Sequence, residues 1–262
     1  MTVNTATITK HLDWMRERNL ATSTIRTRAD ALGALTASHT DILHIDPATI
    51  RAVLDSRAFC PATRNLWRAH FSAFFRWAID EELATSNPMR RVPRVEQPEN
   101  LPRPISETAL ERALATADPR MRAWLTLGAY AGLRAAEISG VIAENVSTDI
   151  GTLRIVGKRR KTRIVPMHPR VVDALAPFAR TTGRLWPNPP RVVTMYISRH
   201  LHQLGYADTA HSLRHRFATS VYDSTGDINL VRELLGHSST ATTQIYARVS
   251  VTRMRTAVAL IA

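Results

Sequence analysis

The sequence predicts a mainly α-helical protein made of two regions, with one small antiparallel sheet in the second region. Apolar residues recur at spacings of three and four over most of the chain, which is typical of amphipathic helices. Prolines interrupt that pattern near the middle, and only two short β-rich runs occur, at 152–156 and 163–166. We therefore expect an all-helical domain over residues 1–88, a proline-rich extended linker over 89–104, and a mostly helical domain over 105–262.

The composition is that of an ordinary globular protein with a strong basic excess. The 262 residues are 44% hydrophobic and carry a net charge of +13, which favours a polyanionic partner. Residues 1–100 hold 13 basic and 11 acidic side chains, whereas residues 101–262 hold 22 and 11, so the excess lies in the second region. The single Cys60 excludes an internal disulfide and a cysteine-built metal site. Without a long apolar run or a signal-like N-terminus, we expect a protein of the bacterial cytoplasm or nucleoid.

Local signals mark the starts of helices in the first region. After a short amphipathic helix around residues 8–15, the Thr-Ser-Thr run at 22–24 offers hydroxyl caps for a second helix. The pair Asp46-Pro47 joins a capping side chain to a proline that suits the first helical position, and it opens a third.

The strongest helical pattern runs from Pro61 to Leu83. Its apolar and aromatic residues predict one buried face, made of Leu66, His70, Phe71, Phe74, Phe75 and Ala78. The other faces carry three arginines, Arg64, Arg68 and Arg76. Taken alone, these arginines indicate a solvated basic surface, with contact to a polyanion as the alternative.

In the second region, Ser106 and the pair Asp118-Pro119 predict two helix starts. Gly128 and Gly132 argue against an unbroken second helix, so Arg134 is expected at its junction with the next one.

The two β-rich runs flank a glycine and a basic stretch, which predicts a hairpin with Lys158 near its tip. Helices are then expected after His168-Pro169 and around residues 193–204, 212–223 and 228–235. Gly236 ends the last of these and leaves the next residues on a turn.

Six residues of the second region form a set that could break a phosphodiester bond with a tyrosine and without a metal. They occur in the strings AGLRAAE, VGKRRK, HSLRHRF and LLGHSSTATTQIY, and they are Arg134, Lys158, His211, Arg214, His237 and Tyr246. Arginines offer forked donors to the oxygens of a phosphate. A phenol needs a neighbour that takes its proton or stabilises the phenolate, and a lysine or histidine can protonate the leaving oxygen.

On these motifs, which span the second region in order, the chain resembles the tyrosine recombinases of the phage integrase family. The resemblance implies that Arg134 and Arg214 hold the scissile phosphate, that Tyr246 attacks it, and that Lys158 protonates the departing 5′-oxygen. The product would be a 3′-phosphotyrosyl link and a free 5′-hydroxyl, so that the step is reversible without ATP.

The resemblance also implies supporting roles. His211 would assist proton transfer, His237 would hydrogen-bond the phosphate, and Glu137 would orient the arginines. Apart from the resemblance, we expect His215 to support the core or a neighbouring group. Expected DNA contacts come from arginines of the first region and linker and from the basic turn: Arg64, Arg68, Arg76, Arg90, Arg91, Arg159, Arg160 and Lys161.

The implied protein is a simple recombinase without an arm-binding domain, in phage or mobile-element integration and excision. It would need no cofactor or metal, and would act as a homotetramer on double-stranded DNA sites. An accessory directionality factor or a host DNA-bending protein is a possible further partner, and no membrane is involved.

Each residue also has a plain structural interpretation, and rivals remain within the set. Lys161 is an alternative to Lys158, and Tyr206 and Tyr222 are alternatives to Tyr246. Zinc ligation by the three histidines 211, 215 and 237 lacks a cysteine or a neighbouring carboxylate to complete it. A type IB topoisomerase-like nicking enzyme and a DNA-binding repressor with relic catalytic residues are the alternative functions.

Overall fold

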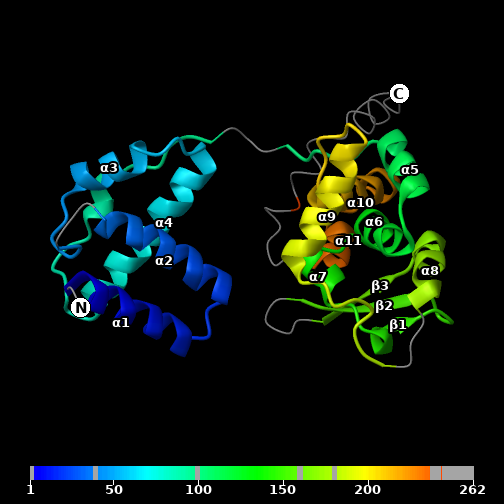
Figure 1. Ribbon diagram of the computed structural model, residues 1–262, viewed down its shortest axis with the longest axis horizontal. Helices are drawn as coiled ribbons and strands as arrows, with labels where there is room; N and C mark the ends of the chain where they lie inside the picture. Colours follow the sequence, from blue (N-terminus) through cyan, green and yellow to red (C-terminus); the bar gives the residue numbers. More distant parts are fainter. Residues whose placement is uncertain are drawn as a thin grey trace, which may run out of the picture. The chain divides into compact units, whose positions relative to one another are not determined.

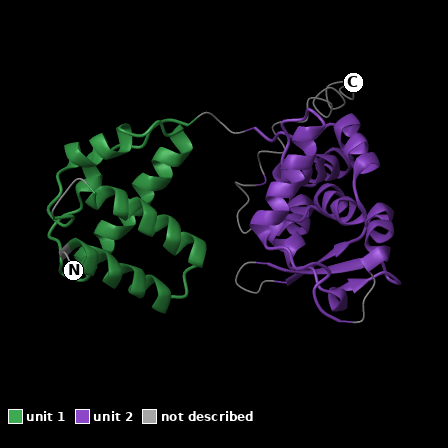
Figure 2. Cartoon of the chain, viewed as in Figure 1, with its two compact units in different colours: residues 1–99 green, residues 100–262 purple. Residues whose placement is uncertain are grey.

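The computed structural model describes residues 3–37, 41–97, 101–157, 162–178 and 182–236, together with Thr243. The chain divides into two compact units, residues 1–99 and 100–262 (Figure 2). Each unit has its own buried apolar core.

The described part of the first unit is built from helices, as predicted (Figure 1). They are α1 (Val3–Glu17), α2 (Thr22–Thr36), α3 (Pro47–Asp55), α4 (Pro61–Asp80) and the short 3-10 helix η1 (Pro88–Arg91). The carboxylate of Asp46 accepts hydrogen bonds from the backbone N–H groups of Ala48 and Thr49, so the predicted cap of α3 is confirmed. The predicted cap of α2 is wrong, because Ala21 precedes the helix and the three hydroxyl residues already lie inside it.

Helix α4 supplies the aromatic centre of this core. Phe71, Phe74 and Phe75 are fully buried, as the spacing predicts, and they pack with residues of α2 and α3. Leu66 is an exception, because 49% of it is exposed. The helical period placed Leu66 at the edge of the buried face, where no neighbouring element of the described chain covers it.

The expected linker begins later than the proline content suggested. Residues 88–91 form η1, where the side chain of Asn87 caps the N–H of Met89 and Pro88 takes the first position, which a helix tolerates. Met89 and Val92 are buried in the core of the first unit. The prediction of extended chain from residue 89 is therefore wrong for this stretch.

The second unit is mostly helical around a small antiparallel sheet. Its helices are α5 (Glu107–Thr116), α6 (Pro119–Ala131), α7 (Ala135–Ser139), α8 (Pro169–Leu175), α9 (Pro190–Gln203), α10 (Ala210–Thr225) and α11 (Ile228–Leu235), with short 3-10 helices η2 (Ala143–Asn145) and η4 (Ala176–Phe178). The sheet has the order β1 (Val146–Ser147), β2 (Thr152–Val156), β3 (Thr162–Pro166). Strands β2 and β3 form the predicted antiparallel hairpin, with Arg154 opposite Ile164, whereas the two-residue β1 had no sequence signal.

Helix α6 is the central element of the second unit. Residues 123–129 are all buried, and α5, α8, α9 and α10 pack around the helix (Figure 1). Although the glycines argued against an unbroken helix, α6 continues through Gly128. The glycine there makes room for Leu213 of α10, whose Cβ would lie 2.9 Å from a Cβ atom at position 128. Gly132 then ends the helix in the left-handed conformation, with φ of 66°, and Arg134 lies at the predicted junction before α7.

Among the helices that the structure describes, none combines the length and apolar character needed to cross a bilayer.

Candidate active site

Arg134 is placed by the tight turn between α6 and α7. It precedes α7 in an extended conformation, and its backbone N–H donates to the Glu137 carboxylate at 2.9 Å. Its side chain keeps 41% of its surface exposed. The guanidinium of Arg134 is therefore fixed at its base and accessible from solvent.

Arg214 lies in α10 and is buried, with 2% of its side chain exposed. Its Nη1 donates to the backbone carbonyl of Gly132, and its Nη2 donates to that of Leu235 at 2.8 Å. These carbonyls belong to the carboxyl-terminal ends of α6 and α11, where a helix leaves carbonyls without intrahelical partners. Arg214 thus supplies hydrogen bonds to a carbonyl at the end of each helix and links the two ends.

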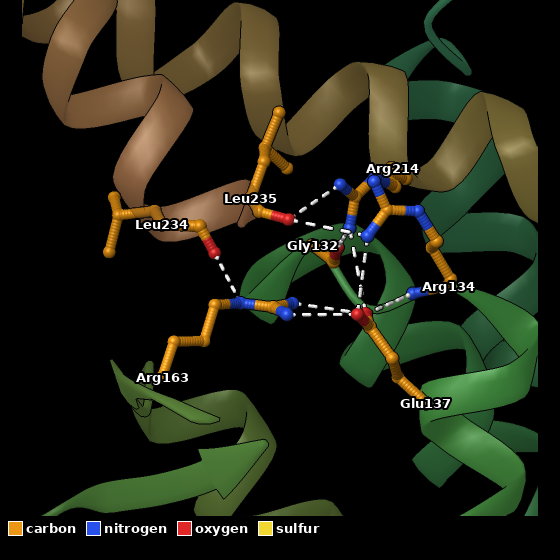
Figure 3. Close-up of polar contacts among 7 residues, drawn as sticks. All are labelled: Gly132, Arg134, Glu137, Arg163, Arg214, Leu234 and Leu235. Atoms are coloured by element: carbon orange, nitrogen blue, oxygen red, sulfur yellow. Dashed lines mark hydrogen bonds and ion pairs between the residues drawn. The ribbon is translucent and has the colours of Figure 1, made fainter. Parts of the chain in front are cut away.

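Glu137 is the acceptor on which three arginines converge (Figure 3). We call Arg134, Glu137, Arg163 and Arg214 the Glu137 cluster. Arg163 of β3 binds both carboxylate oxygens, at 2.8 and 3.0 Å. Arg134 approaches one of them at 3.2 Å, and Arg214 lies 3.6 Å from the other.

The electrostatics of the cluster favour an anion. Burial by itself raises the pKa of Glu137, but the hydrogen bonds and charge of Arg163, with the charge of Arg214, outweigh it and hold that pKa below its usual value. Glu137 is thus a carboxylate at neutral pH and offsets only one of the three guanidinium charges. The remaining positive charge lies beside the exposed Arg134, where it can stabilise a phosphate.

Two histidines of α10 lie next to this cluster. The rings of His211 and His215 meet edge to face, with centroids 4.5 Å apart. Burial first, and then the charges of Arg214 and Arg134, lower the pKa of His211. Burial, His211 and Arg214 lower the pKa of His215 to about 4. Both rings are neutral at neutral pH, so each could accept a proton but neither would carry charge to the site.

Several predicted site residues fall beyond the part of the chain that the structure describes. They are Lys158, Arg159, Arg160, Lys161, His237 and Tyr246. Their nearest described neighbours along the sequence are Gly157 and Thr162 on either side of the first four, and Gly236 and Thr243 near the last two. Gly236 has a φ of 64° and ends α11, as predicted.

The arginines predicted to contact DNA in the first unit differ in their surroundings. Arg64 binds Asp55 at 2.9 Å, and Arg68 donates to the backbone carbonyl of Val92 at 2.6 Å. These two side chains hold the fold together, so the interpretation of α4 as carrying a simple solvated basic surface is wrong for them. Arg76 is exposed.

Arg90 and Arg91 of η1 are also exposed. Both line a hollow of about 680 Å³, together with His44 and Asn87. Their guanidinium groups remain accessible to a phosphate backbone, unlike those of Arg64 and Arg68.

Sequence reasoning did not select Arg163, although it makes the shortest contacts with Glu137. Its partners lie 26 and 71 residues away along the chain. The available signal was an arginine in a strand whose neighbours Ile164 and Val165 are apolar. An arginine at a half-buried strand position needs an acidic or hydrogen-bonding partner. This requirement could have indicated that Arg163 belongs to the site.

Within the described ranges, no three histidine, cysteine or acidic side chains come together as a metal site.

A family model described as the phage integrase family matches residues 104–253, more than half of the chain and all of the Glu137 cluster. The chain belongs to this family. The tyrosine recombinase XerC of Methylobacterium sp. (strain 4-46) is 36% identical over 251 residues, which cover 82% of the chain and 77% of that relative. The predicted family and fold class are therefore confirmed, and the enzyme is a tyrosine recombinase.

Solved structures agree with this fold. The integrase from mycobacterium phage Brujita matches at 28% identity with a TM-score of 0.50, covering 94% of the chain and 88% of that protein. A lambda integrase tetramer bound to a Holliday junction matches with a TM-score of 0.72 over 90% of the chain and 77% of that protein. At 19% identity, the second match shows the shared fold.

Proposed function

We propose that this enzyme exchanges DNA strands at a specific site, through a covalent 3′-phosphotyrosyl intermediate formed by Tyr246. The Glu137 cluster carries the proposal, because its carboxylate holds Arg134 and Arg214, the two arginines expected to bind the phosphate, and the side chain of Arg134 is accessible from solvent. Membership in the tyrosine recombinase family, through relatives that match most of the chain, supports the same reaction.

In the proposed reaction, the Tyr246 oxygen attacks the scissile phosphorus and displaces the 5′-oxygen of the next nucleotide. His211 accepts the phenol proton, for which its neutral ring is suited. Lys158 gives a proton to the 5′-oxygen as it leaves. Arg134 and Arg214 stabilise the negative charge that develops on the nonbridging oxygens, and His237 hydrogen-bonds the same phosphate.

Rejoining is the reverse of cleavage. A 5′-hydroxyl, from the same strand or its partner duplex, attacks the phosphotyrosyl bond and releases the phenol. One phosphodiester bond is formed for each that is broken, so the reaction requires no ATP. The choice of hydroxyl determines whether the strand is resealed or exchanged.

Four protomers would act on two double-stranded DNA sites and pass through a Holliday junction. The lambda integrase tetramer bound to such a junction, which shares the fold, supports this assembly. The net charge of +13 and the exposed Arg76, Arg90 and Arg91 suit a polyanionic partner. A directionality factor or a DNA-bending host protein would govern which way the exchange runs.

The test is to capture DNA that becomes covalently attached to the protein. The chain is mixed with nicked duplexes carrying a random or genomic segment, and denaturant-resistant complexes are isolated and sequenced. We expect one family of related sequences, and none from Tyr246→Phe. Adducts of unrelated sequence, with relaxation of any supercoiled plasmid, would indicate a topoisomerase-like enzyme. Salt-sensitive binding without adducts would indicate a repressor.

The captured sequences also identify the biological setting. Ends of a phage or mobile element would support integration and excision, whereas a fixed chromosomal locus would support a resolution role.

A further inference from the structure

Among the three arginine side chains of the cluster, that of Arg163 makes the closest contacts with the Glu137 carboxylate. Its guanidinium contacts of 2.8 and 3.0 Å span both oxygens, whereas the guanidinium groups of Arg134 and Arg214 stand at 3.2 and 3.6 Å from one oxygen each. The backbone N–H of Arg134 also donates to the carboxylate, at 2.9 Å. The side chain of Arg163 is 13% exposed, so this forked pair is shielded from solvent. A forked, desolvated arginine–carboxylate pair restricts both side chains to one geometry.

The third nitrogen of Arg163 reaches a different element. Its Nε donates to the backbone carbonyl of Leu234 at 2.8 Å, near the end of α11 (Figure 3). The next carbonyl, that of Leu235, accepts from Arg214 at 2.8 Å and from Arg134 at 3.4 Å. All three arginines therefore hydrogen-bond the end of the helix that leads to His237.

Gly236, which follows α11, also lies against the Arg163 side chain. A Cβ atom at Gly236 would come within 3.0 Å of Nη1 and 3.1 Å of Cδ of Arg163. All three guanidinium nitrogens of Arg163 have partners within the protein. Its guanidinium is thereby suited to organising other groups, while Arg134, with 41% of its side chain exposed, is suited to meeting a phosphate.

We propose that Arg163 is a positioning residue for strand cleavage, an inference that rests on the proposed function. By holding both oxygens of Glu137, it fixes the carboxylate that aligns Arg134 and Arg214. By holding the carbonyl of Leu234, it sets the end of α11, and with it the start of the segment that carries His237 and Tyr246. It acts through these groups and does not touch the DNA.

The experiment measures single-turnover formation of the covalent adduct on a nicked suicide duplex that carries the captured site, with the full-length chain at saturating concentration. Wild type is compared with Arg163→Gln and Arg163→Lys. Arg154→Gln is the matched control, because Arg154 is an exposed arginine on the adjacent strand, opposite Ile164. DNA affinity and the thermal midpoint are measured for every variant.

We expect Arg163→Gln to slow cleavage by about 100-fold, the cost typical of a misplaced catalytic group, with DNA affinity within about twofold of wild type. Arg163→Lys should remain nearly as slow, because a single ammonium cannot hold two carboxylate oxygens and a carbonyl at once. Arg154→Gln should cleave at the wild-type rate once DNA is saturating.

A double variant separates positioning from a direct role. Because two of the three guanidinium nitrogens of Arg163 act on Glu137, the rate loss in the double variant Arg163→Gln with Glu137→Gln should be well below the product of the two single losses. A rate loss in the double variant equal to the product of the two single losses would contradict the inference. So would cleavage at the wild-type rate by Arg163→Lys or by Arg163→Gln. If Arg163→Gln is unfolded at the assay temperature, the rate of Arg163→Lys decides. Failure of wild type itself to form an adduct would instead overturn the proposed function.

Discussion

Nη2 of Arg214 lies 2.8 Å from the backbone oxygen of Leu235, across 21 residues of sequence. Together with the bond from Nη1 to the carbonyl of Gly132, this contact fixes a buried guanidinium between two helix ends. Both partners are backbone carbonyls, so rearrangement of neighbouring side chains would not easily move the guanidinium of Arg214. It follows that the site depends on the fork of Arg214 as well as on its charge.

Arg214→Lys is predicted to reduce the rate of adduct formation by about 100- to 1,000-fold, the range found when one preorganised donor to a developing oxyanion is removed. The lysine retains the charge but cannot reach both carbonyls. Arg216→Lys is the control on the same helix, where the arginine binds the exposed Glu107 and the Ala129 carbonyl. Equal rates for the two lysine variants would contradict this account of Arg214.

The pH dependence of cleavage should reflect His211. Because burial and the neighbouring arginines lower its pKa, the ring is neutral above its usual value of about 6.5 and is protonated only at lower pH. As a proton acceptor, it should give a cleavage rate that is level above that pH and falls below it. His211→Gln should be slower and lose this acidic limb. A wild-type rate that begins to fall on acidification from well above pH 6.5 would contradict the assignment.

The close approach of α6 and α10 at Gly128 should make that position intolerant of any side chain. A Cβ atom there would lie 2.9 Å from Cβ and 3.0 Å from Cδ1 of Leu213. We expect Gly128→Ala to lower the free energy of unfolding by about 1–3 kcal/mol, as overpacking does. The control is Gly33→Ala in α2, where a Cβ atom meets nothing within 4 Å.

Gly33→Ala should instead raise the free energy of unfolding, by up to about 1 kcal/mol, because alanine suits a helix interior better than glycine does. Urea titration of both variants measures the difference. Equal effects of the two substitutions would contradict the packing argument.

A buried histidine should make the first unit sensitive to acid. Burial first, and then the charge of Arg28, lower the pKa of His11 to about 3. His11 is fully buried, and its Nε2 lies 3.2 Å from Nη1 of Arg28. The unfolded chain binds the proton near pH 6.5, so the stabilising contribution of neutral His11 is complete above that pH and is lost as the pH falls towards 3.

Between pH 7.5 and 5.0, this single group should reduce the free energy of unfolding by about 2 kcal/mol. His11→Gln keeps a hydrogen-bond acceptor for Arg28 but does not titrate, so its stability should fall less over the same interval. Urea titrations of the full-length chain at both pH values measure this. Identical losses in wild type and variant would refute the role of His11.

The sequence predicted features that depend on neighbouring residues. The pairs Asp46-Pro47 and Asp118-Pro119 mark helix starts, because the aspartate side chain caps the helix and the proline fixes φ at its first position. Both effects are local. Gly132 and Gly236 end helices because each adopts a positive φ, which glycine permits without strain. Such signals do not require knowledge of the tertiary fold.

Features that depend on distant residues were missed or wrong. Gly128 appeared to weaken α6, but its small size is what allows Leu213 to pack against the helix. Arg68 was expected on an open surface, yet it holds the chain that returns to α4 after residue 87. Arg163 is defined by its contacts with Glu137 and Leu234, which only folding brings together.

The central claim is that Tyr246 becomes esterified to DNA, and peptide mapping of the trapped adduct tests it most directly. The complex on the nicked duplex is digested with protease and nuclease, and the modified peptide is identified by mass spectrometry. The account predicts one nucleotide 3′-phosphate on Tyr246 and no adduct from Tyr246→Phe. An adduct on Tyr206, Tyr222 or any other residue, or one that survives in Tyr246→Phe, would contradict it.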